Sequence, residues 1–256
     1  MTRIQNLCVL GSDAPEAQTA VRRLRHRYGH VAAEKSDVIV ALGGDGFMLQ
    51  TLHSHMDLAT PVYGMNRGSV GFLMNDYDEE GLEERLYQAR QAVINPLKMV
   101  ATDQVGKTHE ALAINEVSLF RQKYQAAKIR IVVDGTEQLG ELVCDGVLVA
   151  TPAGSTAYNL SAHGPILPIR SRLMALTPIS PFRPRRWRGA ILDWDTRLDF
   201  EIQETEKRPV AATADHVEVR GVQTVSVQAA SEIEMKLLYD PGRGLEERLL
   251  QEQFTV

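Results

Sequence analysis

The spacing of hydrophobic residues changes character near residue 97. Up to that point, short apolar runs alternate with stretches whose apolar residues recur at helical spacing. The apolar runs predict strands at Ile4–Leu10, Asp37–Leu42 and Pro61–Met65. The stretches between them predict helices at Ala14–Tyr28, after Asp45, and at Glu79–Ala92, where acidic residues stand first and Arg90 stands near the end. Strands that alternate with helices predict an α/β domain with a mostly parallel sheet.

From residue 98 onward the apolar segments are short, β-rich and separated by turn residues. Asp134-Gly135 favours a hairpin turn, and Leu245–Gln253 has the pattern of a closing helix. We therefore expect an α/β domain over residues 1–97 and a β-rich, sandwich-like domain over residues 98–235. A C-terminal segment, residues 236–256, would pack its helix back on the first domain. The strands expected in the second domain are Lys98–Thr102, Val117–Phe120, Ala127–Val133, Glu137–Cys144, Val147–Ala150, Ala190–Asp193, Arg197–Ile202, Val210–Thr213, Val217–Arg220 and Thr224–Gln228.

Composition narrows the classes of function. The chain has 256 residues, an ordinary share of hydrophobic and charged residues, and a formal net charge of −5, which gives no general attraction to nucleic acid or acidic membranes. Cys8 and Cys144 are isolated, so they fit neither a zinc site nor a disulfide framework. The N-terminus has no signal-peptide pattern, and no apolar run approaches membrane-spanning length. We expect a cytoplasmic protein without nucleic-acid or membrane partners.

The most informative motif is Gly43-Gly44-Asp45-Gly46, directly after the apolar run that ends at Leu42. Glycines let the backbone approach a phosphate closely, and the N-terminus of the following helix favours an anion. An aspartate would repel phosphate unless it acts as a general base or as the partner of a divalent cation. The motif therefore favours phosphoryl transfer over passive nucleotide binding. The alternative is an ordinary strand–turn–helix in which the aspartate caps the helix.

Three further segments contain residues that could contact a nucleotide. A glycine-rich stretch, Gly64–Leu73, is expected at the carboxyl edge of the sheet, where a second phosphate- or base-contacting loop would lie, or it is a plain connection. Asn115-Glu116 interrupts an apolar β run, as a hairpin turn or as a pair that binds a base edge and a ribose diol. The segment Asp145–Pro165 combines small residues, hydroxyls and Tyr158, which suits a nucleotide.

The region Pro165–Arg188 is rich in proline and arginine. A solvated or interface loop is the more ordinary interpretation, and the functional one is that one or two arginines face phosphates. The arginines are Arg170, Arg172, Arg183, Arg185, Arg186 and Arg188.

Taken in order and spacing, GGDG, the Asn-Glu pair and the run TPAGSTAYNLSAHGP closely resemble the NAD kinases. The resemblance covers nearly the whole chain. It implies a phosphofructokinase-like α/β domain that carries GGDG and a β-sandwich-like domain that holds most of the NAD site. It also implies transfer of the ATP γ-phosphoryl group to the 2′-hydroxyl of the adenosine ribose of NAD.

The resemblance assigns roles to individual residues. It implies that Asp45 activates or orients the acceptor hydroxyl, and that ATP phosphates meet a set of turn residues: Gly43, Gly44, Gly46, Asn66 and Gly68. The implied NAD contacts, some expected from a neighbouring subunit, are Asp45, Gly46, Phe72, Asn115, Glu116, Asp145, Thr156, Ala157, Tyr158, Ser161, Asp215 and His216. A divalent ion, expected to be Mg²⁺, would be held mostly by ATP phosphates and water rather than by protein ligands. A homodimer or homotetramer is implied as well.

Four positions depart from the family pattern. Phe47 stands where a hydroxyl residue usually follows GGDG, and Ala153 stands where Thr or Ser is common. His163 and His216 stand where glycine is common. These changes leave ATP and polyphosphate open as donors. A GGDG-type lipid kinase and a non-catalytic NAD-binding regulator are the alternative functions.

Overall fold

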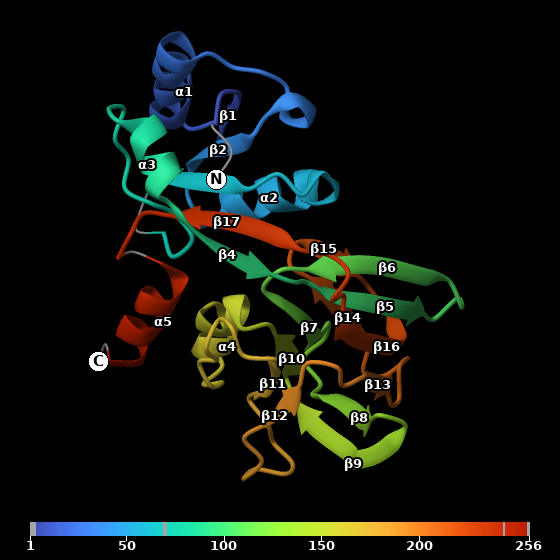
Figure 1. Ribbon diagram of the computed structural model, residues 1–256. Coiled ribbons are helices and arrows are strands. Elements are labelled where there is room, and N and C mark those ends of the chain that lie inside the picture. Colours follow the sequence, from blue (N-terminus) through green and yellow to red (C-terminus); the bar gives the residue numbers. More distant parts are fainter. Residues whose placement is uncertain (1–3, 69–70, 243, 255–256) are drawn as a thin grey trace. The chain divides into compact units, whose positions relative to one another are not determined.

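The computed structural model describes residues 4–68, 71–242 and 244–254 (Figure 1). Contacts divide the chain into two compact units. The first unit comprises Met1–Ile94 and Ile233–Val256, and the second unit comprises Asn95–Glu232. The domain limits expected from the sequence, at 97/98 and 235/236, stay predictions.

The first unit is built on one sheet with the strand order β1-β2-β3-β17-β4 in the described chain. The first four strands run parallel, and β4 pairs antiparallel with β17. The mostly parallel α/β architecture is therefore confirmed. The strands are β1 (Leu7–Gly11), β2 (Val38–Gly43), β3 (Val62–Asn66), β17 (Met235–Tyr239) and β4 (Arg90–Ile94).

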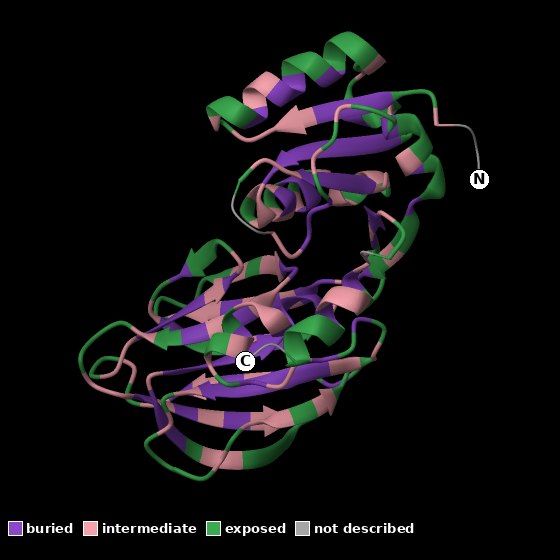
Figure 2. Cartoon of the chain, turned by 90° about the vertical axis from the view of Figure 1, so that its left-hand side faces the viewer, coloured by how far each residue is buried: buried purple, intermediate pink, exposed green. Residues whose placement is uncertain are grey.

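Helices pack on this sheet through apolar faces. Helix α1 (Pro15–Tyr28) begins with proline at its first turn and buries Ala17, Val21 and Leu24 at helical spacing against β1 and β2. Strand β2 is buried along its whole length, as expected for a strand inside a parallel sheet (Figure 2). The other helical elements are η1 (Ala33–Lys35), α2 (Asp45–His55), η2 (Met56–Leu58), α3 (Leu82–Gln88) and α5 (Leu245–Phe254).

The predicted helix Glu79–Ala92 is wrong at both ends. Helix α3 spans only Leu82–Gln88, and Arg90 lies in β4 rather than in a last helical turn. Residues 90–94 form a strand because β17 pairs with them from Met235 to Tyr239. That pairing, between β4 and the red strand β17 in Figure 1, comes from a remote segment that local spacing does not reveal. Strand β17 itself is not among the predicted strands.

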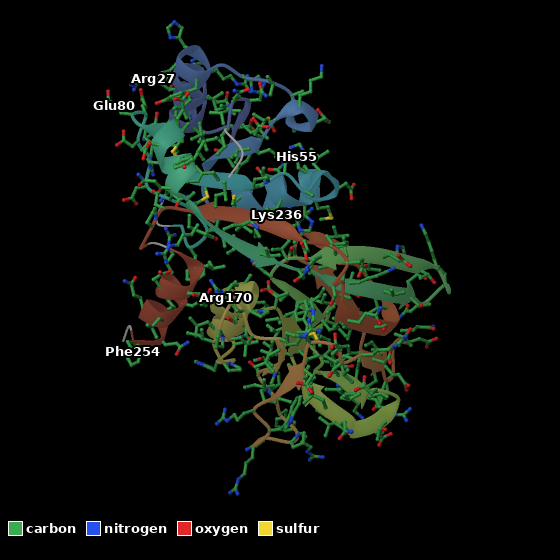
Figure 3. The ribbon with its side chains drawn as sticks, in the orientation of Figure 1. Arg27, His55, Glu80, Arg170, Lys236 and Phe254 are labelled. Atoms are coloured by element: carbon green, nitrogen blue, oxygen red, sulfur yellow. The ribbon has the colours of Figure 1, made fainter. Side chains whose placement is uncertain are left out.

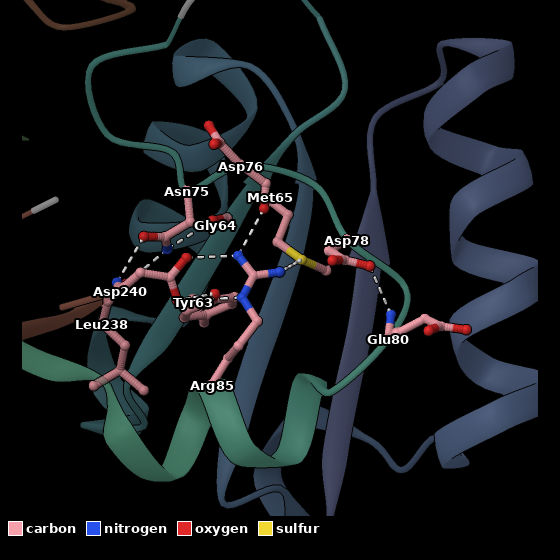
Figure 4. Close-up of polar contacts among 10 residues, drawn as sticks. All are labelled: Tyr63, Gly64, Met65, Asn75, Asp76, Asp78, Glu80, Arg85, Leu238 and Asp240. Atoms are coloured by element: carbon pink, nitrogen blue, oxygen red, sulfur yellow. Dashed lines mark hydrogen bonds and ion pairs between the residues drawn. The ribbon is translucent and has the colours of Figure 1, made fainter. Parts of the chain in front are cut away.

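A polar network fixes the end of β17 to the rest of the first unit (Figure 4). Arg85 of α3 donates to both carboxylate oxygens of Asp240, at 3.3 and 2.6 Å, and Tyr63 Oη donates to the same carboxylate at 2.6 Å. The Asn75 side chain donates to the carbonyls of Gly64 and Leu238 and accepts from the Asp240 N–H. Asn75 is thereby pinned between β3 and β17.

The second unit contains two antiparallel sheets of six strands each among the described residues. Their orders are β12-β11-β10-β7-β14-β15 and β6-β5-β16-β13-β8-β9. One core contains residues from both sheets, such as Val149 and Phe200, so the all-β sandwich is confirmed. The predicted hairpin turn at Asp134-Gly135 joins β8 to β9. The strands are β5 (Leu97–Asp103), β6 (Thr108–Ala113), β7 (Glu116–Arg121), β8 (Ala127–Val133), β9 (Thr136–Cys144), β10 (Gly146–Ala150), β11 (Leu173–Ile179), β12 (Ala190–Asp193), β13 (Leu198–Ile202), β14 (Val210–Ala214), β15 (Val217–Val219) and β16 (Val222–Ala229).

The interpretation of Pro165–Arg188 as one long loop is wrong, because the middle of this region forms a strand. Residues 173–179 form β11, which lies between β10 and β12 and is buried except at its ends. Pro178 obscures this strand in the sequence because proline is rare inside sheets. The part with Arg183, Arg185, Arg186 and Arg188 does lie outside the strands and is exposed. In the described residues, no helix is both long and apolar enough to cross a membrane.

Candidate functional site

The GGDG motif forms the turn between β2 and α2, as the sequence predicts. Strand β2 ends at Gly43, Gly44 precedes the helix, and Asp45 is the first residue of α2. A Cβ atom at Gly43 would lie 2.9 Å from the Cβ of Phe47, whereas the same atom at Gly44 or Gly46 would meet nothing within 4 Å. No side chain caps the start of α2. The turn is thus open at the end of the helix that favours an anion.

Asp45 does not cap its own helix. Its Oδ2 accepts a hydrogen bond from the Phe72 N–H at 2.6 Å, and its Oδ1 accepts one from the Leu73 N–H at 2.8 Å. Gly71 is needed beside it, because an added Cβ there would lie 2.9 Å from Oδ1. The carboxylate is therefore fixed in place by the backbone of residues 71–73.

The glycine-rich stretch after β3 meets the GGDG turn at the carboxyl edge of the sheet. Asn66 pairs with Gly43 in the register of β2 and β3, and the Arg67 N–H donates to the Gly43 carbonyl at 2.8 Å. The Asn66 Oδ1 accepts from the Gly68 N–H, which closes a local turn. The Arg67 guanidinium stacks 4.2 Å from the centre of the Tyr77 ring. Ser69 and Val70 of this stretch lie outside the described residues.

A pocket of about 300 Å³ lies beside this turn, within the first unit. Phe47 lines it on one side, Gly11 at the end of β1 on another, and Gln18 and Arg25 of α1 also face it. His55, which ends α2 and is labelled in Figure 3, contributes as well. Sequence reasoning did not find this pocket, because its walls come from two helices that are separate in the chain.

In the second unit, Asn115-Glu116 is not a hairpin turn. Asn115 lies in the connection between β6 of one sheet and β7 of the other, and Glu116 is the first residue of β7. Thr151 fixes one side of this connection, since its Oγ1 donates to the Ile114 carbonyl at 2.7 Å and its N–H donates to the Asn115 carbonyl at 2.9 Å. Gly154 lies so close that an added Cβ would be 2.1 Å from the Asn115 oxygen.

Asp215 fixes the opposite side of the same connection. Its Oδ2 accepts from the Ile114 N–H at 2.6 Å, and its Oδ1 accepts from the Asn115 and Glu116 N–H groups at 3.0 and 3.3 Å. Asp215 adopts a left-handed backbone with φ of 49°. The position implied as an NAD contact therefore also holds the Asn-Glu backbone, and exposed His216 follows it directly.

Glu116 is the unusual group of this site. Its Oε2 is shut off from solvent and has no hydrogen-bond partner among the described residues. Burial raises the pKa of Glu116 to about 7, with a further contribution from the negative charge of Asp215. A buried carboxyl oxygen without a partner is costly, so the site is suited to a ligand that donates hydroxyl hydrogens.

Tyr158 lies within electrostatic reach of both Glu116 and Asp145. Burial raises the pKa of Tyr158, and the charges of Glu116 and Asp145 raise it further. Tyr158 keeps 38 % of its surface exposed, so its ring is available for stacking. Asp145 accepts from Arg121 Nε at 2.5 Å, a contact that the sequence did not suggest. The structure thus gathers Glu116, Asp145, Tyr158 and Asp215 in the second unit.

The small-residue run after β10 folds as two short helical turns, η3 (Ala153–Thr156) and α4 (Tyr158–Ser161). Buried Asn159 supports both, donating to the carbonyls of Ser155 and Pro165 and accepting from the Thr177 hydroxyl. This inner scaffold leaves Thr156 and Ala157 half-buried and Ser161 exposed. His163 has a φ of 62°, a left-handed backbone conformation that favours glycine.

Sequence comparison identifies the family. Residues 10–88 match the ATP-NAD kinase N-terminal domain, and residues 114–238 match the ATP-NAD kinase C-terminal domain. The chain belongs to the NAD kinase family. It is 60 % identical over 256 residues to an NAD kinase of Caulobacter vibrioides, covering 100 % of this chain and 97 % of the relative. It is 56 % identical over 244 residues to an NAD kinase of Hyphomonas neptunium, covering 95 % and 96 %.

Solved structures of an NAD kinase and an NADH kinase share the fold. An NAD kinase from Archaeoglobus fulgidus in complex with ATP has a TM-score of 0.77 and 24 % identity, with 98 % of this chain and 99 % of that chain covered. A yeast NADH kinase complexed with NADH has a TM-score of 0.82 and 20 % identity, with 99 % and 88 % covered. The GGDG turn lies in the part matched by the N-terminal family domain, and the Asn-Glu pair lies in the part matched by the C-terminal one.

Proposed function

We propose that this member of the NAD kinase family transfers the γ-phosphoryl group of ATP to the 2′-hydroxyl of the adenosine ribose of NAD, giving NADP. The observation that carries the proposal is the fixed carboxylate of Asp45 at an uncapped helix start, directly after an open glycine turn. The family match favours this activity over a GGDG-type lipid kinase or a non-catalytic regulator. Formation of NADP from NAD and ATP, followed with an NADP-specific dehydrogenase, tests it; no turnover would contradict it.

Asp45 is proposed as the general base or orienting group for the acceptor hydroxyl. Two backbone N–H groups fix its carboxylate, and each oxygen retains further lone pairs for the hydroxyl proton. Phosphoryl transfer needs little covalent chemistry from the protein, so orientation of the attacking oxygen is a large part of the catalysis.

The donor phosphates are proposed to bind at the GGDG turn and the adjoining loop. Gly44 and Gly46 leave space for them, and Gly43, Asn66 and Gly68 shape the surrounding backbone. The pocket lined by Gln18, Arg25 and Phe47 lies beside this turn, and its mixed polar and apolar walls suit the nucleoside part of ATP. Measuring NADP formation with ATP and with polyphosphate would decide between the two donors; we expect ATP.

Mg²⁺ is proposed to accompany ATP. No group of three His, Cys, Asp or Glu side chains in the described part of the chain is placed to hold a metal ion. The ion is proposed to be held mainly by phosphate oxygens and water, where it would neutralise phosphate charge.

The NAD side of the reaction is proposed to use the second-unit cluster. Glu116 would accept from both hydroxyls of a ribose, Asn115 would contact adenine, and Tyr158 would stack on a ring. Further contacts are proposed for Phe72, Asp145, Thr156, Ala157, Ser161, Asp215 and His216.

NAD affinity should depend on pH through Glu116. Acceptance from two hydroxyls needs the ionised carboxylate, and the pKa of this group is raised to about 7, so it gains its proton as pH falls through that value. The KM for NAD should therefore rise below pH 7, by up to about tenfold per pH unit for one proton. Steady-state kinetics from pH 6 to 8 measure this. Glu116→Gln should remove the dependence, and a KM for NAD that is flat in the parent protein would contradict the assignment.

A homodimer or homotetramer with composite NAD sites is proposed for the assembled protein. The sheets of the second unit end in edge strands, β12 and β15 in one and β6 and β9 in the other, and exposed apolar side chains such as Phe182 and Ile191 lie in this unit. Light scattering at assay concentration should give a multiple of the chain mass. A fully active monomer would contradict it. The cytoplasm is the proposed compartment.

A further inference from the structure

We propose that Arg248 of the C-terminal helix α5 is a positioning residue for Asp45, acting through the backbone of Gly71, Phe72 and Leu73. The inference rests on the proposed catalytic role of Asp45 and adds a residue more than two hundred positions later in the chain. Arg248 was not singled out by any motif, and the contacts described below lie within the first unit.

Hydrogen bonds link Arg248 to Asp45 along two parallel routes, each through one peptide group of the backbone. Arg248 Nη1 donates to the Gly71 carbonyl at 3.0 Å and to the Phe72 carbonyl at 2.8 Å. The Gly71 carbonyl and the Phe72 N–H belong to one peptide group, and the Phe72 carbonyl and the Leu73 N–H belong to the next. Those two N–H groups are the ones that bind the Asp45 carboxylate.

Two consecutive planar peptide groups are therefore held between a cation and an anion. Each peptide group accepts from Arg248 at its oxygen end and donates to Asp45 at its nitrogen end. Because a peptide group is planar and stiff, fixing its carbonyl also fixes the direction of its N–H. Hydrogen bonds in such chains also polarise one another, so the guanidinium strengthens the donors that Asp45 uses.

The residues around Arg248 hold it in place and put it near Asp45. Helix α5 is anchored by buried Leu245 and Leu249, which flank Arg248 in the sequence. The guanidinium lies 5.9 Å from the centre of the buried Tyr239 ring. Burial raises the pKa of Tyr239, the Arg248 charge lowers it, and the Asp45 charge raises it, which places both charges near the same ring.

Asn75 already anchors the far end of the segment, as Figure 4 shows. Loss of Arg248 should therefore loosen residues 71–73 without detaching the whole loop. Asp45 would then lose its fixed direction, and a misplacement of about 1 Å can cost about a hundredfold in rate. We expect Arg248→Met to lower kcat by about 10- to 100-fold, with the KM for NAD changed less than about threefold.

A double-mutant cycle tests the connection. The variants are Asp45→Asn, Arg248→Met and the two combined, compared by kcat at saturating NAD and ATP. If Arg248 acts through Asp45, the combined variant should be no slower than Asp45→Asn alone, because the group that Arg248 positions is already disabled. If the loss of kcat in the combined variant equals the product of the two single losses, the inference is overturned. A slow Asp45→Asn beside a normal Arg248→Met would also overturn it, leaving the proposed function intact.

The proposed function fails separately if Asp45→Asn alone keeps a near-normal kcat. Arg248→Lys is a second variant for the case in which Arg248→Met does not fold. Lysine keeps the positive charge, and its one ammonium nitrogen can donate to both carbonyls as Nη1 of Arg248 does. It should keep kcat within about threefold of the parent protein; a folded Arg248→Lys as slow as Asp45→Asn would overturn the inference. Leu250→Ala, at a side chain 58 % exposed on the same helix, is the matched control and should leave kcat unchanged.

Discussion

Replacing Asp45 by asparagine should lower kcat by about 10²- to 10⁴-fold, the range of a general-base contribution. Asparagine keeps the size of the side chain but removes the charge that takes or orients the hydroxyl proton. Its amide oxygen can accept only one of the two hydrogen bonds now made by the Phe72 and Leu73 N–H groups. The other N–H would face an NH₂ group, so the side chain would also lose its fixed direction.

Steady-state kinetics and NAD titration of the Asp45→Asn protein make the measurement. NAD should still bind, because Asp45 is only one of the proposed NAD contacts and the others remain. Asp57→Asn, at an exposed aspartate in the same unit, is the control and should have parental kinetics. A near-normal kcat in Asp45→Asn would rule out the proposed role.

Replacing Glu116 by glutamine should lower kcat/KM for NAD by about 10- to 100-fold, since a hydrogen bond to a charged group is worth about 1.5–3 kcal/mol. Glutamine matches the shape of Glu116 but offers one acceptor oxygen where the ionised carboxylate offers two. The free Oε2 of Glu116 is the observation behind this expectation. The effect should be largest near pH 8, where the parent carboxyl is ionised because its pKa is about 7.

The kinetics should vary NAD and ATP separately. The KM for ATP should change little, because the donor is proposed to bind at the GGDG turn. Asn115→Ala should likewise weaken NAD and relax discrimination against hypoxanthine-containing analogues. Glu110→Gln, at an exposed glutamate on β6, serves as the control. A raised KM for ATP with an unchanged KM for NAD would show that the Asn-Glu pair has been wrongly assigned.

Much of the fold was predictable because its signals are local. The apolar run Val38–Leu42, followed by glycines and Asp45, indicated a buried strand, a tight turn and a helix, and the structure has them there. The short β-rich segments after residue 97, separated by turn residues, indicated the β sandwich. Strands β4 and β11 were missed for different reasons: β4 is a strand because the distant β17 pairs with it, and buried β11 was obscured by its own Pro178.

The candidate site also has a part that local sequence signals predicted and a part that they did not. Residue types and the family resemblance named Asp45, Asn115 and Glu116, which occur in recognisable local motifs. The contacts that hold these residues in place had no such signal. Thr151, directly after β10, and Asp215, directly after β14, fix the Asn-Glu backbone, and Asp215 lies about a hundred residues away in sequence. Contacts of this kind depend on tertiary structure, so only the three-dimensional arrangement reveals them.

The most direct test of the account follows the phosphoryl group itself. The parent protein would be incubated with NAD, Mg²⁺ and ATP labelled in its γ-phosphoryl group, and the products would be separated and mapped. The account predicts that the label appears in NADP, on the 2′-oxygen of the adenosine ribose, at a rate that the Asp45→Asn variant lowers by about 10²- to 10⁴-fold. Label recovered only as inorganic phosphate, or on another oxygen of the dinucleotide, would contradict it.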